Sequence, residues 1–208
     1  MIIKTLAVGP IMANCHILGC EKTKEAAVID PGDDADRILH TLAELNLTVK
    51  LILNTHGHFD HVGGNRRLIE VTEAPLMIHE FDAPMLESLS QSASAWGMRA
   101  ENSPAPDQFL EDSDNVTFGH LSLAVIHTPG HTRGGVSFHT DGAVFVGDTL
   151  FAGSIGRTDF PGGDYDTLIT SIQKKLFPLG DEVVVYTGHG PETSIGHEKR
   201  SNPFARIQ

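Results

Sequence analysis

The chain has 208 residues, of which 40% are hydrophobic and 20% are charged, and its mean hydropathy is −0.09. This composition is typical of one globular domain with a real core, and no apolar run approaches the roughly 18 to 20 residues that a membrane-spanning helix needs. The formal net charge of −12 excludes a nucleic-acid partner, because an acidic surface repels phosphate backbones.

The amino-terminal segment and the two cysteines bear on the cellular location of the protein. The first ten residues lack a basic region followed by a long apolar stretch, so we expect no signal peptide and a cytoplasmic location. Cys15 and Cys20 stand five positions apart, which provides neither a disulfide framework nor a zinc-ribbon spacing. We therefore expect reduced thiols, one or both packed inside the protein.

Strands and helices alternate through the first half of the chain. Short apolar runs separated by turn residues predict strands at Ile2–Val8, Met12–Gly19, Glu25–Ile29, Val49–Leu53 and Leu76–His79. Apolar residues at helical spacing predict helices from an N-cap at Asp33 or Asp34 through Leu45, from Gly63 to about Glu73, and near Phe81–Leu89.

A long loop is expected to separate this half from the next, with Trp96 anchoring it to the core or, alternatively, covering the pocket. Strands then resume at Asn115–Phe118, Leu121–His127, Val136–His139, Ala143–Val146 and, as the last strand, Val183–Tyr186. The glycine-rich stretch Gly153–Gly163 is predicted to be loop, and a late helix is marked by Leu168, Ile169, Ile172 and Leu176. The two halves predict two packed sheets with helices outside, in one domain.

Potential metal ligands follow four of these strands at their C-terminal ends. Glycines stand beside or near them, which lets the backbone turn sharply and approach a ligand. Packing alone does not explain four strand ends of this kind. The candidate ligands are His56, His58, Asp60 and His61 after one strand, and His131, Asp148 and His189 after three others.

The spacing of these residues favours two ions. His56 and His58, two apart in an extended chain, can point at the same ion, whereas Asp60 and His61 lie where the chain turns and can serve a neighbouring ion. Five imidazoles and two carboxylates suit borderline metals such as Zn²⁺, Fe or Mn²⁺. Seven ligands exceed one tetrahedral site but suit two ions that share a carboxylate and a water. We expect two divalent cations. Zinc is the favoured metal, and iron and manganese are the alternatives.

The ligand motifs resemble those of the metallo-β-lactamase superfamily. They are Thr55-His56-Gly57-His58-Phe59-Asp60-His61, His127-Thr128-Pro129-Gly130-His131-Thr132, Gly147-Asp148-Thr149 and Gly188-His189-Gly190. The resemblance implies an α/β fold, a four-layer αββα sandwich, with a dinuclear site at one sheet edge. It also implies that His56, His58 and His131 hold one metal, that Asp60, His61 and His189 hold the other, and that Asp148 bridges them.

Within that superfamily the chain is most similar to the glyoxalase II group. The stretch Leu150–Phe160 resembles that group's loop after the bridging aspartate, with Arg157 in the place of a basic thiol-binding residue and Asp159 in place of a tyrosine. Full-length glyoxalase II enzymes carry an added C-terminal helical domain. We expect residues 1–208 to form one hydrolase domain without a separate glutathione-binding helical domain.

The expected activity is metal-dependent hydrolysis of a small-molecule thioester, such as S-lactoylglutathione. Two divalent ions about 3.5 to 4 Å apart lower the pKa of a bound water toward about 7, and the hydroxide attacks a carbonyl. A thiol leaving group, with a pKa of about 8.5, needs no strong general acid. Asp60, which could receive the proton of the nucleophile, and Asp148 are the expected catalytic residues.

Two arginines are candidates for substrate contacts. Guanidinium pairs bidentately with carboxylates, so Arg157 and Arg133 could each bind a substrate carboxylate. Each could equally structure its own loop, Arg157 through Asp159 or Asp164.

Other functions remain open from sequence alone. A persulfide dioxygenase of the same superfamily uses one iron held by the residues matching His56, His131 and Asp148, and it shares a Gly-Arg-Thr-Asp-Phe segment. A lactonase uses the same seven ligands. A true β-lactamase is disfavoured, since Asp148 stands where those enzymes usually have Cys or Ser. A non-catalytic metal-binding protein is disfavoured because structural zinc sites are usually Cys-rich. The oligomeric state is left undetermined.

Overall fold

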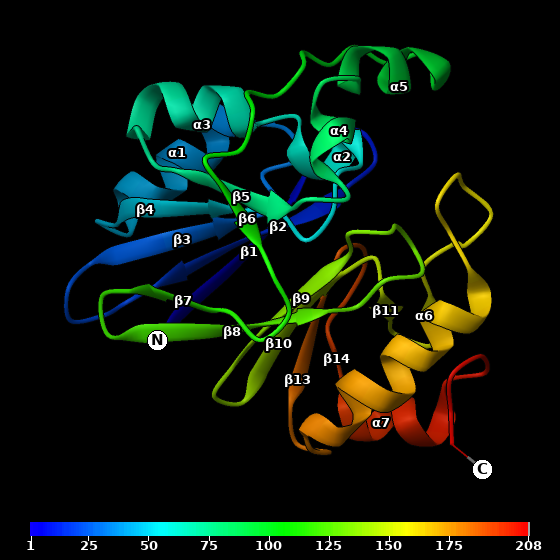
Figure 1. The fold of residues 1–208 in the computed structure, drawn as a ribbon. Helices are drawn as coiled ribbons and strands as arrows, with labels where there is room; N and C mark the ends of the chain where they lie inside the picture. The colour runs from blue at the N-terminus through cyan, green and yellow to red at the C-terminus, as the bar shows by residue number, and fades with distance from the viewer. Residues whose placement is uncertain (208) are drawn as a thin grey trace.

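The computed structural model describes residues 1–207, which form four layers. Two six-stranded sheets pack face to face, and helices cover the outer face of each sheet (Figure 1). The amino-terminal half of the chain builds the first sheet and its helices, and the other half builds the second sheet and its helices. This arrangement confirms the predicted α/β fold of αββα layers in a single domain.

The first sheet has the strand order β1-β2-β3-β4-β5-β6. Its first three strands are antiparallel, and β3 to β6 run parallel. Strands β3 and β4 therefore end at the same edge, and β2, antiparallel to β3, begins there. The strand bounds are β1 Ile2–Val8, β2 Ala13–Gly19, β3 Glu25–Ile29, β4 Thr48–Leu53, β5 Leu76–His79 and β6 Gln108–Leu110.

The second sheet has the order β14-β13-β10-β9-β8-β7. Strands β10 and β13 are parallel and end side by side, while the other pairs are antiparallel. The bounds are β7 Asn115–Phe118, β8 Leu121–His127, β9 Val136–Thr140, β10 Ala143–Gly147, β13 Val184–Thr187 and β14 Thr193–Ser194; a separate ribbon pairs β11 Leu150–Phe151 with β12 Ser154–Ile155.

Three apolar clusters hold the layers together. The central cluster combines residues of both sheets, such as Ile29 and Leu53 from the first and Phe138 and Phe145 from the second. One outer cluster packs α1 and α3 on the first sheet, and the other packs α6, the following turns and α7 on the second. The helices are α1 Ala35–Glu44, α2 Phe59–Val62, α3 Asn65–Thr72, α4 Ala83–Leu86, α5 Leu89–Ala95, α6 Tyr165–Ser171 with a π turn Ile172–Leu176 and a 3-10 turn Phe177–Leu179, and α7 Ile195–Ser201.

The segment after β5 differs from the prediction. A single helix near Phe81–Leu89 followed by a long loop is wrong, because two short helices, α4 and α5, occupy the segment and a strand, β6, follows. Leu86, Leu89 and Ala93 lie at helical spacing and are all buried, which explains the extension. Trp96 does not anchor the core, since 56% of its surface is exposed.

Several local predictions also need correction. Asp34 takes the N-cap position of α1, but its carboxylate accepts no hydrogen bond from the helix and instead accepts one from the Gly9 amide. Val183–Tyr186 is not the last strand, because β14 follows it. The glycine-rich stretch is not entirely loop, since Ser154–Ile155 pairs with Leu150–Phe151 across the turn at Gly153, whose φ is +70°.

The structure also describes the cysteines and the lengths of the helices. Cys15 and Cys20 are both buried and unbridged, as the spacing predicted. Among residues 1–207, no helix is long and apolar enough to span a lipid bilayer.

We predict that Phe138→Ala lowers the free energy of unfolding by about 3–5 kcal/mol, because the buried ring fills the space between the sheets. Phe109→Ala is the control, since this ring is exposed, and it should change stability by less than about 0.5 kcal/mol. Denaturant unfolding monitored by circular dichroism measures both. Equal losses in the two variants would contradict the placement of the central core.

Candidate metal centre

The seven candidate ligands meet at one edge of the sandwich. The segment after β4 carries four of them, His56 and His58 in the loop and Asp60 and His61 in α2, and the loops after β8, β10 and β13 carry one each. Strands β10 and β13 are parallel and end side by side in the second sheet. The short distances between ligand atoms place the segment after β4 of the first sheet at the same edge. The ligands predicted from sequence are thus brought together from both halves of the chain.

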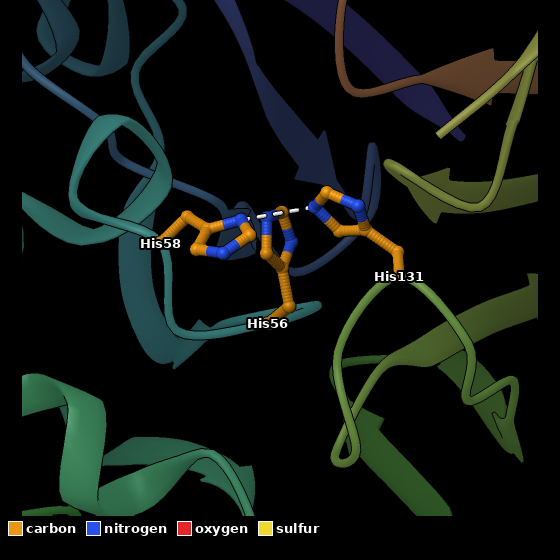
Figure 2. Close-up of side chains that lie close together, drawn as sticks. All are labelled: His56, His58 and His131. Carbon is orange, nitrogen blue, oxygen red and sulfur yellow. Dashed lines mark hydrogen bonds between the residues drawn. The ribbon is translucent and has the colours of Figure 1, made fainter. Parts of the chain in front are cut away.

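The first cluster consists of three imidazoles. Ligand nitrogens of His56, His58 and His131 all lie within 4.8 Å of one another. His131 Nε2 is 2.9 Å from His58 Nδ1, and the three rings point toward a common space between two loops (Figure 2). His56 and His131 are buried, and His58 is partly exposed.

The second cluster combines two imidazoles with a carboxylate. Asp60, His61 and His189 offer atoms within 4.8 Å of one another. His61 Nε2 lies 3.2 Å from His189 Nε2, and Asp60 Oδ2 lies 3.3 Å from the same His189 nitrogen. Asp60 and His189 are partly exposed, so this cluster is reachable from solvent.

Asp148 lies between the two clusters and faces both. Its Oδ1 is 3.4 Å from His61 Nε2 in the second cluster, and its Oδ2 is 3.6 Å from His131 Nε2 in the first. Oδ2 is also 3.7 Å from His189 Nε2. A single carboxylate can therefore serve two neighbouring cation positions.

The distances within both clusters fit divalent cations. Zinc–nitrogen bonds of about 2.0–2.1 Å in tetrahedral geometry separate ligand atoms by about 3.3 Å. His58 and His131 are 2.9 Å apart in the first cluster, and the three ligand atoms of the second lie 3.2 to 3.7 Å apart. Two buried polar atoms, His56 Nε2 and Asp148 Oδ1, have no hydrogen-bond partner among the described residues. Buried polar atoms are normally paired, so their position facing the clusters is consistent with bound metal.

Electrostatics at the site also favour added positive charge. Burial lowers the pKa of the His56 imidazole well below its ordinary value, and the neighbouring His61 and His58 lower it further. Burial also lowers the pKa of His61, but the charges of Asp148 and Asp60 outweigh burial and raise it well above the ordinary value. The two carboxylates thus hold positive charge at this place, and a divalent cation supplies such charge while leaving the imidazoles neutral.

Outer hydrogen bonds orient three of the five imidazoles. Nδ1 of His131 lies 2.8 Å from the Arg157 carbonyl oxygen, and Nδ1 of His56 lies 3.0 Å from Thr55 Oγ1. In each ring this contact leaves Nε2 to face the cluster. Metal-ligating histidines usually carry such a partner on the second nitrogen, which fixes tautomer and ring direction.

Asp30 orients the third imidazole and was missed by the sequence analysis. Its Oδ2 lies 3.1 Å from His61 Nδ1 and accepts a hydrogen bond from Thr55 Oγ1 at 2.6 Å, while Oδ1 accepts one from the Thr55 amide at 2.7 Å. The side chain is 1% exposed. The available signal was its position directly after β3, the same strand-end position that the candidate ligands share.

Asp82 was also missed, and it joins two ligand loops. Its Oδ2 accepts a hydrogen bond from the amide of Gly57, between His56 and His58, and its Oδ1 accepts one from the amide of Gly134, after His131. The distances are 3.1 and 2.7 Å. This buried carboxylate therefore sets the separation of the loops that form the first cluster.

The start of β2 holds the His189 loop. The side-chain amide of Asn14 donates hydrogen bonds to the carbonyl oxygens of Thr187 and Gly190, each at 2.9 Å. Its backbone amide donates to the carbonyl oxygen of Gly188 at 2.7 Å. A Cβ atom at Gly188 would collide with the Asp148 carboxylate, so glycine is required for this approach. The first sheet thereby fixes a ligand that belongs to the second.

The two candidate substrate arginines occupy different surroundings. The Arg157 guanidinium forms a bidentate ion pair with Asp159, with both distances 2.7 Å, and lies 3.7 Å over the Phe160 ring. It therefore structures its own loop, the alternative that the sequence left open. Arg133 lines a separate hollow of about 480 Å³ that contains none of the seven candidate ligands.

Trp96 packs at the mouth of the site rather than in the core. Its ring meets Phe160 edge-on at 6.3 Å between centroids, and Phe160 in turn meets His58 at 5.7 Å. The end of α5 and the loop after Asp148 therefore approach each other beside the first cluster.

The fold agrees with comparisons to known proteins. Residues 8–189 match the family described as the Metallo-beta-lactamase superfamily. The chain belongs to this superfamily of metallo-hydrolases, which confirms the resemblance found in the motifs.

Relatives extend over the whole chain. The Hydroxyacylglutathione hydrolase GloC of Haemophilus influenzae is 41% identical over 208 aligned residues, covering 98% of both proteins. Among solved structures, BLEG-1, described as a B3 metallo-beta-lactamase, is 37% identical, with a TM-score of 0.92 over 98% of this chain and 99% of its own. TTHA1623 in a di-iron-bound form is 38% identical, with a TM-score of 0.89 over 97% and 99%.

We predict that Asp30→Asn weakens metal binding about 10- to 100-fold, because the amide replaces the carboxylate that orients His61. Competition with a chromogenic chelator measures the affinity. Asp36→Asn is the matched control, since Asp36 is exposed and pairs with Arg67 away from the site. Unchanged affinity in a folded Asp30→Asn protein would contradict the orienting role.

We also predict that chelation lowers the melting temperature and that added Zn²⁺ restores it. A cation that binds only the native state stabilises it by about 2.7 kcal/mol at 100 times its Kd. Differential scanning calorimetry with and without chelator measures the shift. Identical melting of metal-loaded and metal-free protein would argue against the two clusters as cation sites.

Proposed function

We propose that this chain is a metal-dependent thioesterase that hydrolyses a small hydroxyacyl thioester such as S-lactoylglutathione. The observation that carries the proposal is the pair of ligand clusters that share Asp148. In this proposal His56, His58 and His131 hold one ion; Asp60, His61 and His189 hold the other.

Two divalent ions bound there, with zinc the expected metal, would supply a hydroxide nucleophile at neutral pH and charge for the developing oxyanion. Asp148 keeps both positions in register, since its carboxylate lies within 3.7 Å of imidazole nitrogens of both clusters. Asp60, partly exposed and 3.3 Å from His189 Nε2, receives the proton that the nucleophile releases. The thiolate departs without a strong general acid, because a free thiol has a pKa of only about 8.5.

The comparisons support the proposed thioesterase activity to different degrees. GloC of Haemophilus influenzae, named as a hydroxyacylglutathione hydrolase, aligns over nearly the full length of both chains. BLEG-1 shares the fold closely but is described as a B3 metallo-beta-lactamase, so β-lactam hydrolysis belongs in the same assay panel. The di-iron form of TTHA1623 keeps iron among the candidate metals.

The decisive assay follows thiol release from S-lactoylglutathione by protein whose metal content has been measured. We expect hydrolysis that chelator abolishes and added metal restores. Oxygen consumption with glutathione persulfide, run on the same preparation, tests the dioxygenase. Oxygen uptake without thioester hydrolysis would overturn the proposal in favour of that alternative.

We predict that Asp60→Asn and Asp148→Ala each lower kcat by about 100-fold or more, because each removes a carboxylate from the reacting centre. Asp166→Asn is the control, as this exposed residue lies in the first turn of α6. Circular dichroism verifies folding, and metal analysis verifies loading. Full activity of either variant at full metal content would remove that residue from the proposed mechanism.

A further inference from the structure

A cavity adjoins the second cluster and is not explained by metal binding. It has a volume of about 180 Å³ and is lined mainly by the β1–β2 turn (residues 8–11), by Phe59 and Asp60, and by residues 98–100 after α5. We call it the Arg99 cavity. Asp60 faces both this cavity and the candidate metal cluster, so the two spaces adjoin.

The size and lining of the Arg99 cavity suit part of a substrate. A water molecule occupies about 30 Å³ of liquid, so the space corresponds to about six waters or to one short acyl or amino-acid-sized group. Pro10, Ile11 and Met98 contribute apolar surface. Ligand sites combine such apolar walls with a few polar groups that fix orientation.

Both walls of the cavity are held in place by other elements. The β1–β2 turn is tied to α1, because the Gly9 amide donates to Asp34 at 3.0 Å and Arg37 donates to the Ala7 carbonyl at 2.8 Å. On the other side, Arg66 donates twice to the carbonyl of Asn102, just after residues 98–100. The cavity is therefore built by packing and hydrogen bonds on both sides.

Arg99 provides the only positive charge of the lining. Its side chain is exposed, and among residues 1–207 it forms neither an ion pair nor a side-chain hydrogen bond. Arg66, Arg67 and Arg157, in contrast, each pair with a carboxylate. Asp33 and Asp60 also line the cavity, but neither forms an ion pair with Arg99. In a chain with a net charge of −12, a guanidinium that pairs with no carboxylate is available to a ligand.

We propose that the Arg99 cavity is a substrate subsite that binds a carboxylate-bearing segment of the thioester. Arg99 binds the carboxylate, and the apolar stem of the segment packs against Pro10, Ile11 and Met98. The inference rests on the proposed thioesterase function and adds to it the cavity and the residue that bind a carboxylate of the substrate. The carboxylate can belong to the acyl group or to the thiol, and the experiment separates these two sources.

The binding test uses thioethers, which cannot be hydrolysed, on metal-loaded protein. S-ethylglutathione carries carboxylates on the thiol side, and S-(3-carboxypropyl)-N-acetylcysteamine carries one on the acyl side; each is compared with its ethyl ester. We expect Arg99→Ala to weaken binding of one acid about 10- to 100-fold by calorimetry and to leave its ester unchanged. Arg99→Lys should recover part of the loss, because it keeps the charge but not the bidentate geometry.

The kinetic test uses the matching thioesters, S-propionylglutathione and the succinyl thioester of N-acetylcysteamine, each with its esterified form. Arg99→Ala should raise KM for the acid that binds in the cavity and leave kcat unchanged, since Arg99 is not one of the candidate metal ligands. Arg67→Ala is the control, because it removes one exposed guanidinium outside the cavity.

Equal weakening of acids and esters, or less than a twofold effect of Arg99→Ala on both acids, would overturn the subsite. A carboxylate-dependent binding loss in protein that hydrolyses no thioester would support the subsite and reject the thioesterase proposal instead. The two proposals therefore fail by different results.

Discussion

The structure depends on placing five imidazoles and two carboxylates close together at a largely buried edge of the sandwich, where they can bind metal ions. Such a concentration of polar groups is costly in a protein interior unless each group has a partner. The chain meets this requirement by ending strands of two different sheets at one place. The apolar packing between the sheets, centred on residues such as Phe138 and Phe145, therefore fixes the positions of the ligands as well as the stability of the fold.

Three of the four ligand-bearing segments are tied by contacts that cross between elements. Asp30 supports His61, Asp82 joins the His56 and His131 loops, and Asn14 holds the loop of His189. Asp82 and Asn14 contact backbone groups of these segments, Asp30 contacts the imidazole of His61 itself, and all three side chains are buried. A site assembled on loops is thus given the rigidity that metal coordination and orientation of a substrate require.

Much of this architecture was accessible from sequence, because apolar strands that end in glycine and histidine carry a strong local signal. The strands around the site and all seven candidate ligands follow from that pattern. The roles of Asp30 and Asp82 could not be predicted from this pattern, since they arise from contacts between segments that are 25 to 52 residues apart. The position of α5 and the exposure of Trp96 depend on which face of this segment packs against the rest of the fold. The mixed composition of the segment does not reveal that face.

Both halves of the chain supply metal ligands, so the boundary between the two sheets has a role besides packing. His58 and His131 are 73 positions apart, and His61 and His189 are 128 positions apart. An ion held by such a pair is a cross-link between distant parts of the chain, comparable in its topology with a disulfide that closes a long loop. During synthesis neither cluster exists until its last ligand has emerged, so the second cluster is completed only when almost the entire polypeptide is available.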